Sequence, residues 1–162
     1  MNADPRVLDV LEAIGLPYEV MPCDPAYADT AAFCEHYGVS PNDSANTILV
    51  ASRRPPGRLA ACVVLATTRL DVNRAVCSLL EVRKASFADA ELTLATTGME
   101  IGGVTPFGLP ADLPVFVDSA VMVRPVVVVG AGSRSAKIRL APAVLAALPA
   151  ARVIEGLASP AE

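Results

Sequence analysis

Apolar residues near the N-terminus recur with the period of an α-helix. Val7, Leu11 and Ile14 share one face of a segment that begins at Pro5 and ends at Gly15, a pattern typical of an amphipathic helix. Polar residues that cap helices and glycines that end them mark the remaining helical segments. We expect these helices from Asp29 or Thr30 to Tyr37, from Asp71 onwards, over residues 88–95, and from Pro142 onwards.

β-branched, almost continuously apolar runs indicate two central strands. Residues 47–51 and 59–66 have the composition of strands buried on both faces, and the turn over residues 53–58 joins them. We expect shorter strands over residues 18–21, 82–85, 115–117, 122–123, 126–129, 137–140 and 153–154. Strands and helices are interspersed irregularly, so the pattern favours a mixed α/β (α+β) sheet over a doubly wound parallel one.

Length and composition exclude several classes of protein. The 162 residues match one domain, which we place over residues 1–162, and 53% hydrophobic with 19% charged residues excludes intrinsic disorder. The longest uncharged run, residues 140–151, is too short for a membrane span and contains two prolines. Charged residues within the first dozen positions exclude a secretory signal.

The cysteines and the single histidine predict neither a metal site nor a disulfide framework. Cys23, Cys34, Cys62 and Cys77 are widely spaced, and His36 has no metal-ligating neighbours, so we expect reduced thiols in the cytoplasm and no metal. A net charge of −4 argues against broad nucleic-acid binding. The arginines of the turn at residues 53–58 favour a solvated hairpin tip, with a contact to an RNA backbone as the alternative.

The segment from Thr97 to Gly108, TGMEIGGVTPFG, matches neither a helix nor a strand period. Its glycines would present unobstructed backbone N–H groups, which suit a carbonyl, ribose or phosphate oxygen. It lacks the Gly-Lys-Ser/Thr ending of a Walker loop, and its glycine spacing differs from a dinucleotide fingerprint. On the residues alone, a structural crossover loop is the favoured interpretation and a ligand-binding loop is the alternative.

This segment resembles the T-G-x-x-x-G-G-V-S/T-P-F-G signature of the YbaK and prolyl-tRNA-synthetase-associated editing domains. The resemblance continues along nearly the whole chain in the right order: residues 38–41 and 46–50 resemble the family's first core strand and its lead-in, residues 69–71 its next helix start, and residues 132–142 its late basic hairpin.

The resemblance implies a freestanding trans-editing aminoacyl-tRNA deacylase, which removes a small non-cognate amino acid from tRNA for proline. It also implies a compact mixed sheet, partly closed like a barrel and flanked by helices, and no cofactor. The acceptor end of an aminoacyl-tRNA is the expected partner, together with a synthetase; neither a membrane nor DNA is expected.

The same resemblance supplies the site residues. It implies a reaction centre at Asn46, Thr47, Gly102 and Gly103. The substrate-binding residues that it implies are Gly98, Val104, Thr105, Pro106, Phe107, Gly108, Ser133, Arg134 and Lys137.

The chain departs from the family at one position that matters for catalysis. The family's strand usually reads Lys-Thr-Leu-Val with its lysine at the active site, whereas this chain has Asn46 there. Loss of an ammonium contact in a dry site costs about 10²–10³ in rate. Lys137 is the candidate to replace the missing cation, and Arg134 the candidate phosphate or ribose contact. The alternative function is a binding module for aminoacyl-tRNA or a nucleotide that has lost the chemistry.

Overall fold

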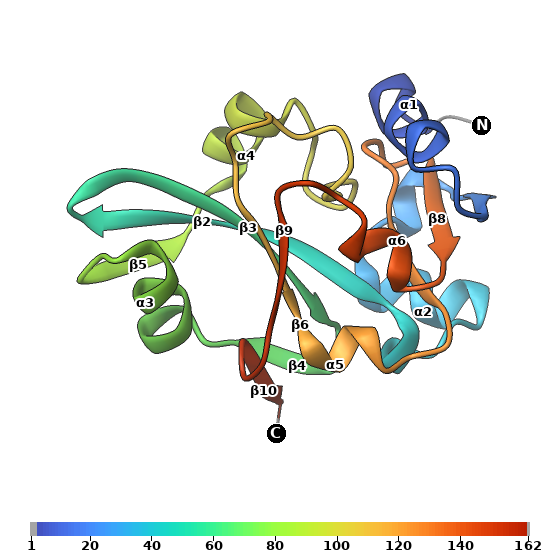
Figure 1. Ribbon diagram of the computed structural model, residues 1–162. Helices are drawn as coiled ribbons and strands as arrows, with labels where there is room; N and C mark the ends of the chain where they lie inside the picture. Colours follow the sequence, from blue (N-terminus) through green and yellow to red (C-terminus); the bar gives the residue numbers. More distant parts are fainter. Residues whose placement is uncertain (1–2, 162) are drawn as a thin grey trace.

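The largest sheet has five strands in the order β5-β2-β3-β6-β9 (Figure 1). The structure is a computed structural model, and it describes residues 3–161. β2 and β3 form a long antiparallel hairpin, because Ala60–Leu65 is an unbroken buried apolar run that fits a strand covered on both faces. β6 and β9 continue the sheet in parallel. The strands are β2 (Ala45–Arg54), β3 (Pro56–Leu65), β5 (Lys84–Phe87), β6 (Val115–Asp118) and β9 (Ala151–Ile154).

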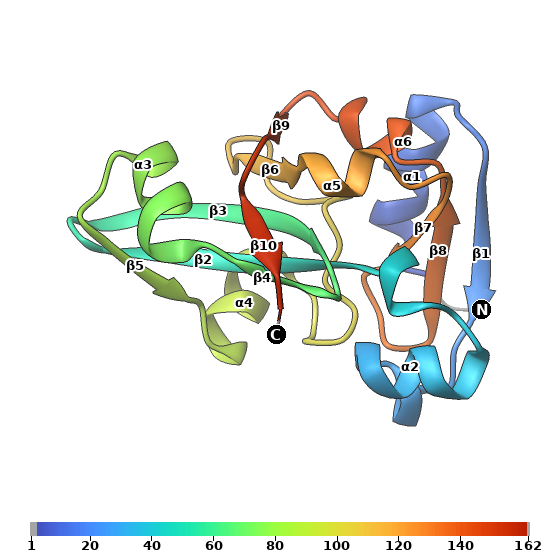
Figure 2. The same cartoon turned by 90° about the horizontal axis from the view of Figure 1, so that it is seen from below.

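A second, three-stranded antiparallel sheet in the order β1-β8-β7 stands at the other end of the molecule (Figure 2). Its strands are β1 (Tyr18–Pro22), β7 (Val127–Gly130) and β8 (Ala136–Leu140). An isolated parallel bridge between Ser44 and Val128 connects it to the start of β2. A two-stranded pair of β4 (Thr68–Leu70) and β10 (Ala158–Pro160) completes the strands.

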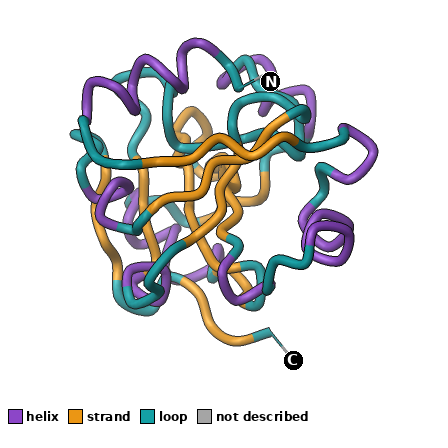
Figure 3. The backbone as a smooth tube through the Cα atoms, turned by 90° about the vertical axis from the view of Figure 1, so that its right-hand side faces the viewer, coloured by secondary structure: helices purple, strands orange, loops and turns teal. Residues whose placement is uncertain are grey.

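Short helices surround the strands (Figure 3). They are α1 (Pro5–Ile14), α2 (Thr30–Tyr37), α3 (Cys77–Leu80), α4 (Ala90–Thr97), α5 (Ser119–Met122) and α6 (Ala143–Ala146). Asp4 and Asp89 cap α1 and α4 by accepting hydrogen bonds from the backbone N–H groups of Arg6 and Leu92. A π-helical turn, Val72–Val76, precedes α3, and the Asp71 carboxylate accepts from the N–H of Arg74 at its start.

The apolar residues divide into three clusters. The largest packs α1 and α6 against both sheets around Phe107, Val63 and Ile138. A second lies between α3 and the other face of the long hairpin, around Val50 and Cys62. A small third cluster beneath α2 contains Phe33, and it lies beside the seam between the two sheets.

The mixed sheet, the long buried hairpin and the N-terminal helix agree with the sequence-based predictions. The expected barrel closure is wrong, since the strands of the described chain form separate open sheets. Residues 122–123 are not a strand, because α5 extends through Met122 and Val123 caps it. The strand expected at residue 82 begins only at Lys84, and α4 lies two residues beyond its predicted bounds. The β4–β10 pair was not predicted.

Candidate functional site

A cavity of about 230 Å³ opens where the two sheets meet. The start of β2 forms one wall, β7 and β8 form another, and residues 101–104 of the glycine-rich loop form a third. The cavity is lined by Asp29, Thr30, Phe33, Ser44, Ala45, Asn46, Thr47, Ile48, Leu49, Ala88, Thr93, Ile101, Gly102, Val104, Val128, Val129, Gly130 and Lys137. Elements far apart in the sequence therefore build one site.

Asn46 is partly buried at the second position of β2 and contributes the carboxamide of the cavity. The Thr30 hydroxyl, at the first position of α2, donates a hydrogen bond to Asn46 Oδ1. This bond occupies the acceptor end of the carboxamide. The amide N–H groups of Asn46 are thereby left as the end available to a ligand.

Lys137 is the buried cation of the cavity. Its Nζ donates to the carbonyl oxygens of Ala28 and Gly102, each at 2.7 Å, and lies 5.5 Å from the centre of the Phe33 ring. Burial lowers the pKa of Lys137 below the usual 10.5, because the protein interior disfavours the charged form. An ammonium has three donors, so two carbonyls leave one for a further acceptor.

Arg134 joins residues 25–29 to the glycine-rich loop from outside the cavity. Its guanidinium donates to the carbonyl oxygens of Ile101 at 2.7 Å and Pro25 at 2.9 Å, and it pairs with the Asp29 carboxylate at 3.1 Å. Asp29 was predicted only as a helix cap, but its side chain makes no capping bond. Lys137 and Arg134 thus fix the segment at residues 25–29 against the glycine-rich loop.

The glycines of the loop permit a close approach of two backbones. Gly103 accepts a hydrogen bond from the N–H of Gly132 at 2.7 Å, and a Cβ on Gly103 would lie 2.7 Å from the backbone of Ser133. At Gly102, where φ is +95°, a Cβ would overlap Arg134 Nη1. Packing against the β7–β8 turn therefore explains this Gly-Gly pair.

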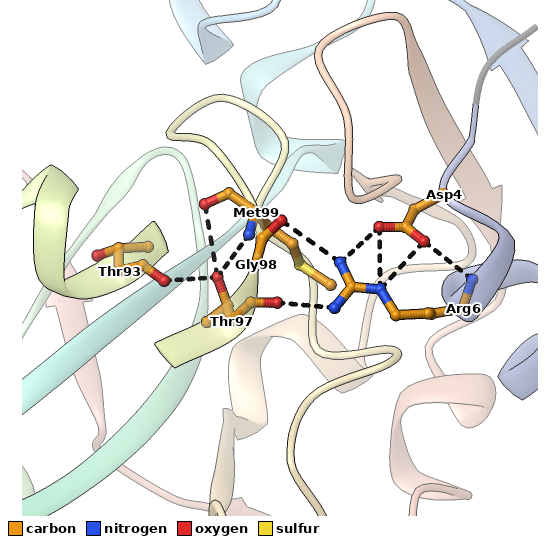
Figure 4. Close-up of polar contacts among 6 residues, drawn as sticks. All are labelled: Asp4, Arg6, Thr93, Thr97, Gly98 and Met99. Carbon is orange, nitrogen blue, oxygen red and sulfur yellow. Dashed lines mark hydrogen bonds and ion pairs between the residues drawn. The ribbon is translucent and has the colours of Figure 1, made fainter. Parts of the chain in front are cut away.

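The beginning of the loop is held by the N-terminus of α1 (Figure 4). Arg6 pairs with Asp4 at 2.6 Å and donates to the carbonyl oxygens of Thr97 and Gly98. The Thr97 hydroxyl donates to the carbonyl of Thr93 at 2.7 Å and accepts from the N–H of Met99 at 3.0 Å. These contacts fix the point at which the loop leaves α4.

The structure brings five of the thirteen predicted site residues to the cavity wall: Asn46, Thr47, Gly102, Val104 and Lys137. Gly98 ends α4 in the left-handed conformation, and the N–H of Gly103 donates to the carbonyl of Glu100. Thr105, Pro106 and Phe107 are buried in the second half of the loop, and Gly108 packs on Arg6. Ser133 and Arg134 lie in the turn behind the loop, where they support it.

Sequence reasoning missed several cavity residues, chiefly Thr30, Phe33, Thr93 and Ile101. Thr30 and Phe33 lie in the helix predicted from Asp29 or Thr30 to Tyr37, but nothing in the helical period shows that this helix covers the start of β2. Thr93 could have drawn attention, because it is a polar residue between Leu92 and Leu94.

The other nucleophile and metal candidates are not assembled into a site. All four cysteines are buried and unpaired, and burial raises the pKa of Cys62 to about 12, away from a reactive thiolate. His36 is exposed and stacks on Tyr27. Within residues 3–161, no three Cys, His, Asp or Glu side chains gather as metal ligands. No helix in that range is both long and apolar enough to span a bilayer.

Comparisons with known proteins agree with the geometry. The fold matches the crystal structure of the hypothetical protein APE2540, with a TM-score of 0.84, 25% identity, and coverage of 95% of this chain and 99% of the other. It also matches a "putative trans-editing enzyme for prolyl tRNA synthetase", with a TM-score of 0.80, 23% identity, and 96% of each chain covered. The family model for the aminoacyl-tRNA editing domain matches residues 24–148. The chain belongs to the aminoacyl-tRNA editing domain family.

Proposed function

We propose that this protein is a deacylase that hydrolyses the ester of a mischarged aminoacyl-tRNA in trans. The observation that carries the proposal is the ammonium of Lys137 in the same cavity as Asn46. A cation on β8 compensates for the carboxamide that replaces the family's lysine on β2. The positive charge has therefore moved from β2 to β8, and the chemistry is retained.

The reaction is the attack of water on the ester carbonyl. The carbonyl oxygen becomes an oxyanion in the tetrahedral intermediate, where the remaining Lys137 N–H and the Asn46 amide stabilise it. Water gives one proton to the departing ribose oxygen, by way of the neighbouring ribose hydroxyl, as the ester C–O bond breaks. The products are the free amino acid and the tRNA with an intact 3′ end.

The size of the cavity favours a small amino acid. Sites for drug-sized ligands occupy about 300–1,000 Å³, whereas this cavity has about 230 Å³. We therefore place the aminoacyl group inside the cavity and the terminal adenosine at its mouth. Alanine or cysteine on tRNA for proline is the proposed substrate, with a synthetase as the delivering partner and the cytoplasm as the compartment.

A deacylation assay tests the proposal. Purified protein is incubated with alanyl-, cysteinyl- and seryl-tRNA for proline, and with correctly charged controls. We expect hydrolysis of one mischarged species well above its spontaneous rate, with the correct species left intact. A folded protein that turns over none of them would be the binding module that the Asn46 substitution also favours, and the proposal would fail.

A further inference from the structure

The charges of this acidic chain are distributed unevenly. Residues 53–84 contain seven of the 13 Lys and Arg residues but only two of the 17 Asp and Glu residues. The rest of the chain therefore carries a large excess of negative charge. Both ends of this segment lie at the far ends of β2 and β5, at the opposite end of the long hairpin from the start of β2 (Figures 1 and 2).

Four cations lie where this hairpin ends and β5 begins, and we call them the basic tip: Arg53, Arg54, Arg83 and Lys84. All four are exposed, and the strand register places Arg54 directly opposite Lys84. The ion pairs found within residues 3–161 join Arg6, Arg124 and Arg134 to carboxylates and involve none of these four. Four like charges without carboxylate partners repel one another, so an anion is the ligand that this surface suits.

One side-chain contact and one backbone contact show that the basic tip is pre-formed. Arg53 donates through Nε to the Ser86 hydroxyl at 2.7 Å, which orients its guanidinium while leaving its outer nitrogens unused. The N–H of Arg83 donates to the carbonyl of Arg54 at 2.7 Å, which fixes the two backbones side by side. A fixed fork of donors is suited to phosphate oxygens.

The distance from the cavity suits a nucleic acid that reaches both places. β2 runs from Asn46 at the cavity to Arg54 at the basic tip. At about 3.3 Å per residue, these eight steps span roughly 26 Å. A substrate whose ester occupies the cavity would reach the basic tip only through a polymer chain. The phosphates of an aminoacyl-tRNA lie along such a chain, beyond its unpaired 3′ end.

We infer that the basic tip binds the phosphate backbone of the acceptor stem while the aminoacyl end occupies the cavity. This inference rests on the proposed function for the orientation of the RNA. The turn itself, Arg53-Arg54-Pro55-Pro56-Gly57-Arg58, offers no large apolar anchor of the kind that protein interfaces use. The acidic remainder of the surface repels RNA, so the basic tip also determines the direction from which the stem approaches.

RNA binding at a series of salt concentrations tests this inference. The probes are uncharged tRNA for proline and a hairpin with its acceptor-stem sequence and unpaired 3′ end. Arg54→Glu is compared with Arg139→Glu, which makes the same change of charge at an exposed position on β8, in the other sheet. We expect Arg54→Glu to weaken binding about tenfold and to reduce the slope of log K against log salt by about 1. Arg139→Glu should leave both values nearly unchanged.

Hydrolysis of a short substrate separates this inference from the proposed function. Aminoacyl-adenosine cannot reach the basic tip, so Arg54→Glu should leave its hydrolysis unchanged while raising KM for aminoacyl-tRNA. Equal losses of RNA affinity in both variants would overturn the inference. So would unchanged RNA affinity in Arg54→Glu. A third outcome separates the two claims. If the parent protein hydrolyses no substrate, and only the Arg54→Glu variant loses RNA affinity, the proposed function fails and the inference stands.

Discussion

The Thr30 hydroxyl donates a hydrogen bond to Asn46 Oδ1, across the join between α2 and β2. A carboxamide can rotate to exchange its donor and acceptor ends, and the two ends differ in what they offer a substrate. In the structure the Thr30 contact is made to the oxygen end of the carboxamide, so the N–H groups remain available. Its importance is therefore greatest if Asn46 stabilises an oxyanion, which needs donors.

Replacing Thr30 with valine tests this orientation. Thr30→Val keeps the shape of the side chain but removes the hydroxyl, so the carboxamide can turn its oxygen toward the ester. We expect a fall in kcat of about tenfold, since one oriented donor is lost, with KM nearly unchanged. Thr30→Ser, which retains the hydroxyl, is the matched control. An equal loss in both variants would point to packing as the cause.

Removing the cavity cation should affect activity strongly. Lys137→Met keeps the length of the side chain and removes the ammonium, and we expect kcat/KM for the edited aminoacyl-tRNA to fall about 10²–10³-fold. The Ala28 and Gly102 carbonyls also lose their donor, so thermal unfolding must be followed in parallel. A folded Lys137→Met protein with parental activity would show that the ammonium takes no part in the reaction.

A lysine introduced on β2 would place two ammonium groups in one cavity. Asn46→Lys should therefore destabilise the protein by roughly 1–3 kcal/mol through like-charge repulsion. The double variant Asn46→Lys/Lys137→Met should recover much of this free energy of unfolding, as measured in urea. Activity gained by Asn46→Lys over an inactive parent would instead identify the parent as a binding module.

The alkaline pH dependence should report on Lys137. Burial chiefly, with a smaller effect of Arg134, lowers its pKa below 10.5, and Cys23, Asp29 and Cys34 partly oppose the shift. As pH rises through this lowered pKa, the ammonium is lost and deacylation should decline before an ordinary lysine would titrate.

Stability should change in the opposite direction over the same pH window. Between the lowered pKa and 10.5, the unfolded chain binds more protons than the folded protein, so the free energy of unfolding gains a contribution that rises with pH. Lys137→Met should abolish that contribution. Parallel decreases of activity and stability would indicate alkaline unfolding as the cause of the lost activity.

The close approach of Gly103 to the β7–β8 turn predicts a structural effect. Gly103→Ala places a Cβ 2.7 Å from backbone atoms of Ser133, which belong to a turn that cannot move as a side chain does. We expect a loss of about 1–3 kcal/mol in the free energy of unfolding. The soluble, folded fraction should retain its kcat if Gly103 acts through packing alone.

Local signals in the sequence account for most of the elements. Pro5 and Gly15 bound α1 in the structure as they do in the pattern, and the buried run at residues 60–65 is the central strand. The strand predicted at residues 122–123 was wrong because two apolar residues fit the end of a helix as well as a strand. The open sheets could not be predicted either, since closure depends on pairings between distant segments.

The candidate site was predicted in part, for a similar reason. The glycine-rich signature located the loop, but spacing along the chain could not reveal that the Gly102–Gly103 pair faces the Ser133 backbone. Lys137 was one of several candidate cations in a hairpin. Its role depends on how the two sheets meet. There the Nζ of Lys137 donates to the carbonyls of Gly102 and Ala28, and the side chain lines the cavity together with Asn46.

The position of Lys137 bears on how members of this family are sorted. A search that requires a lysine at the position of Asn46 would discard this chain as inactive. The ammonium of Lys137 nevertheless lines the same cavity as Asn46, from a strand about ninety residues later in the chain. Under the proposed function, the cation stays in the cavity while its position in the chain moves from β2 to β8. A search for any cation lining the cavity would keep this chain among the candidate deacylases of its family.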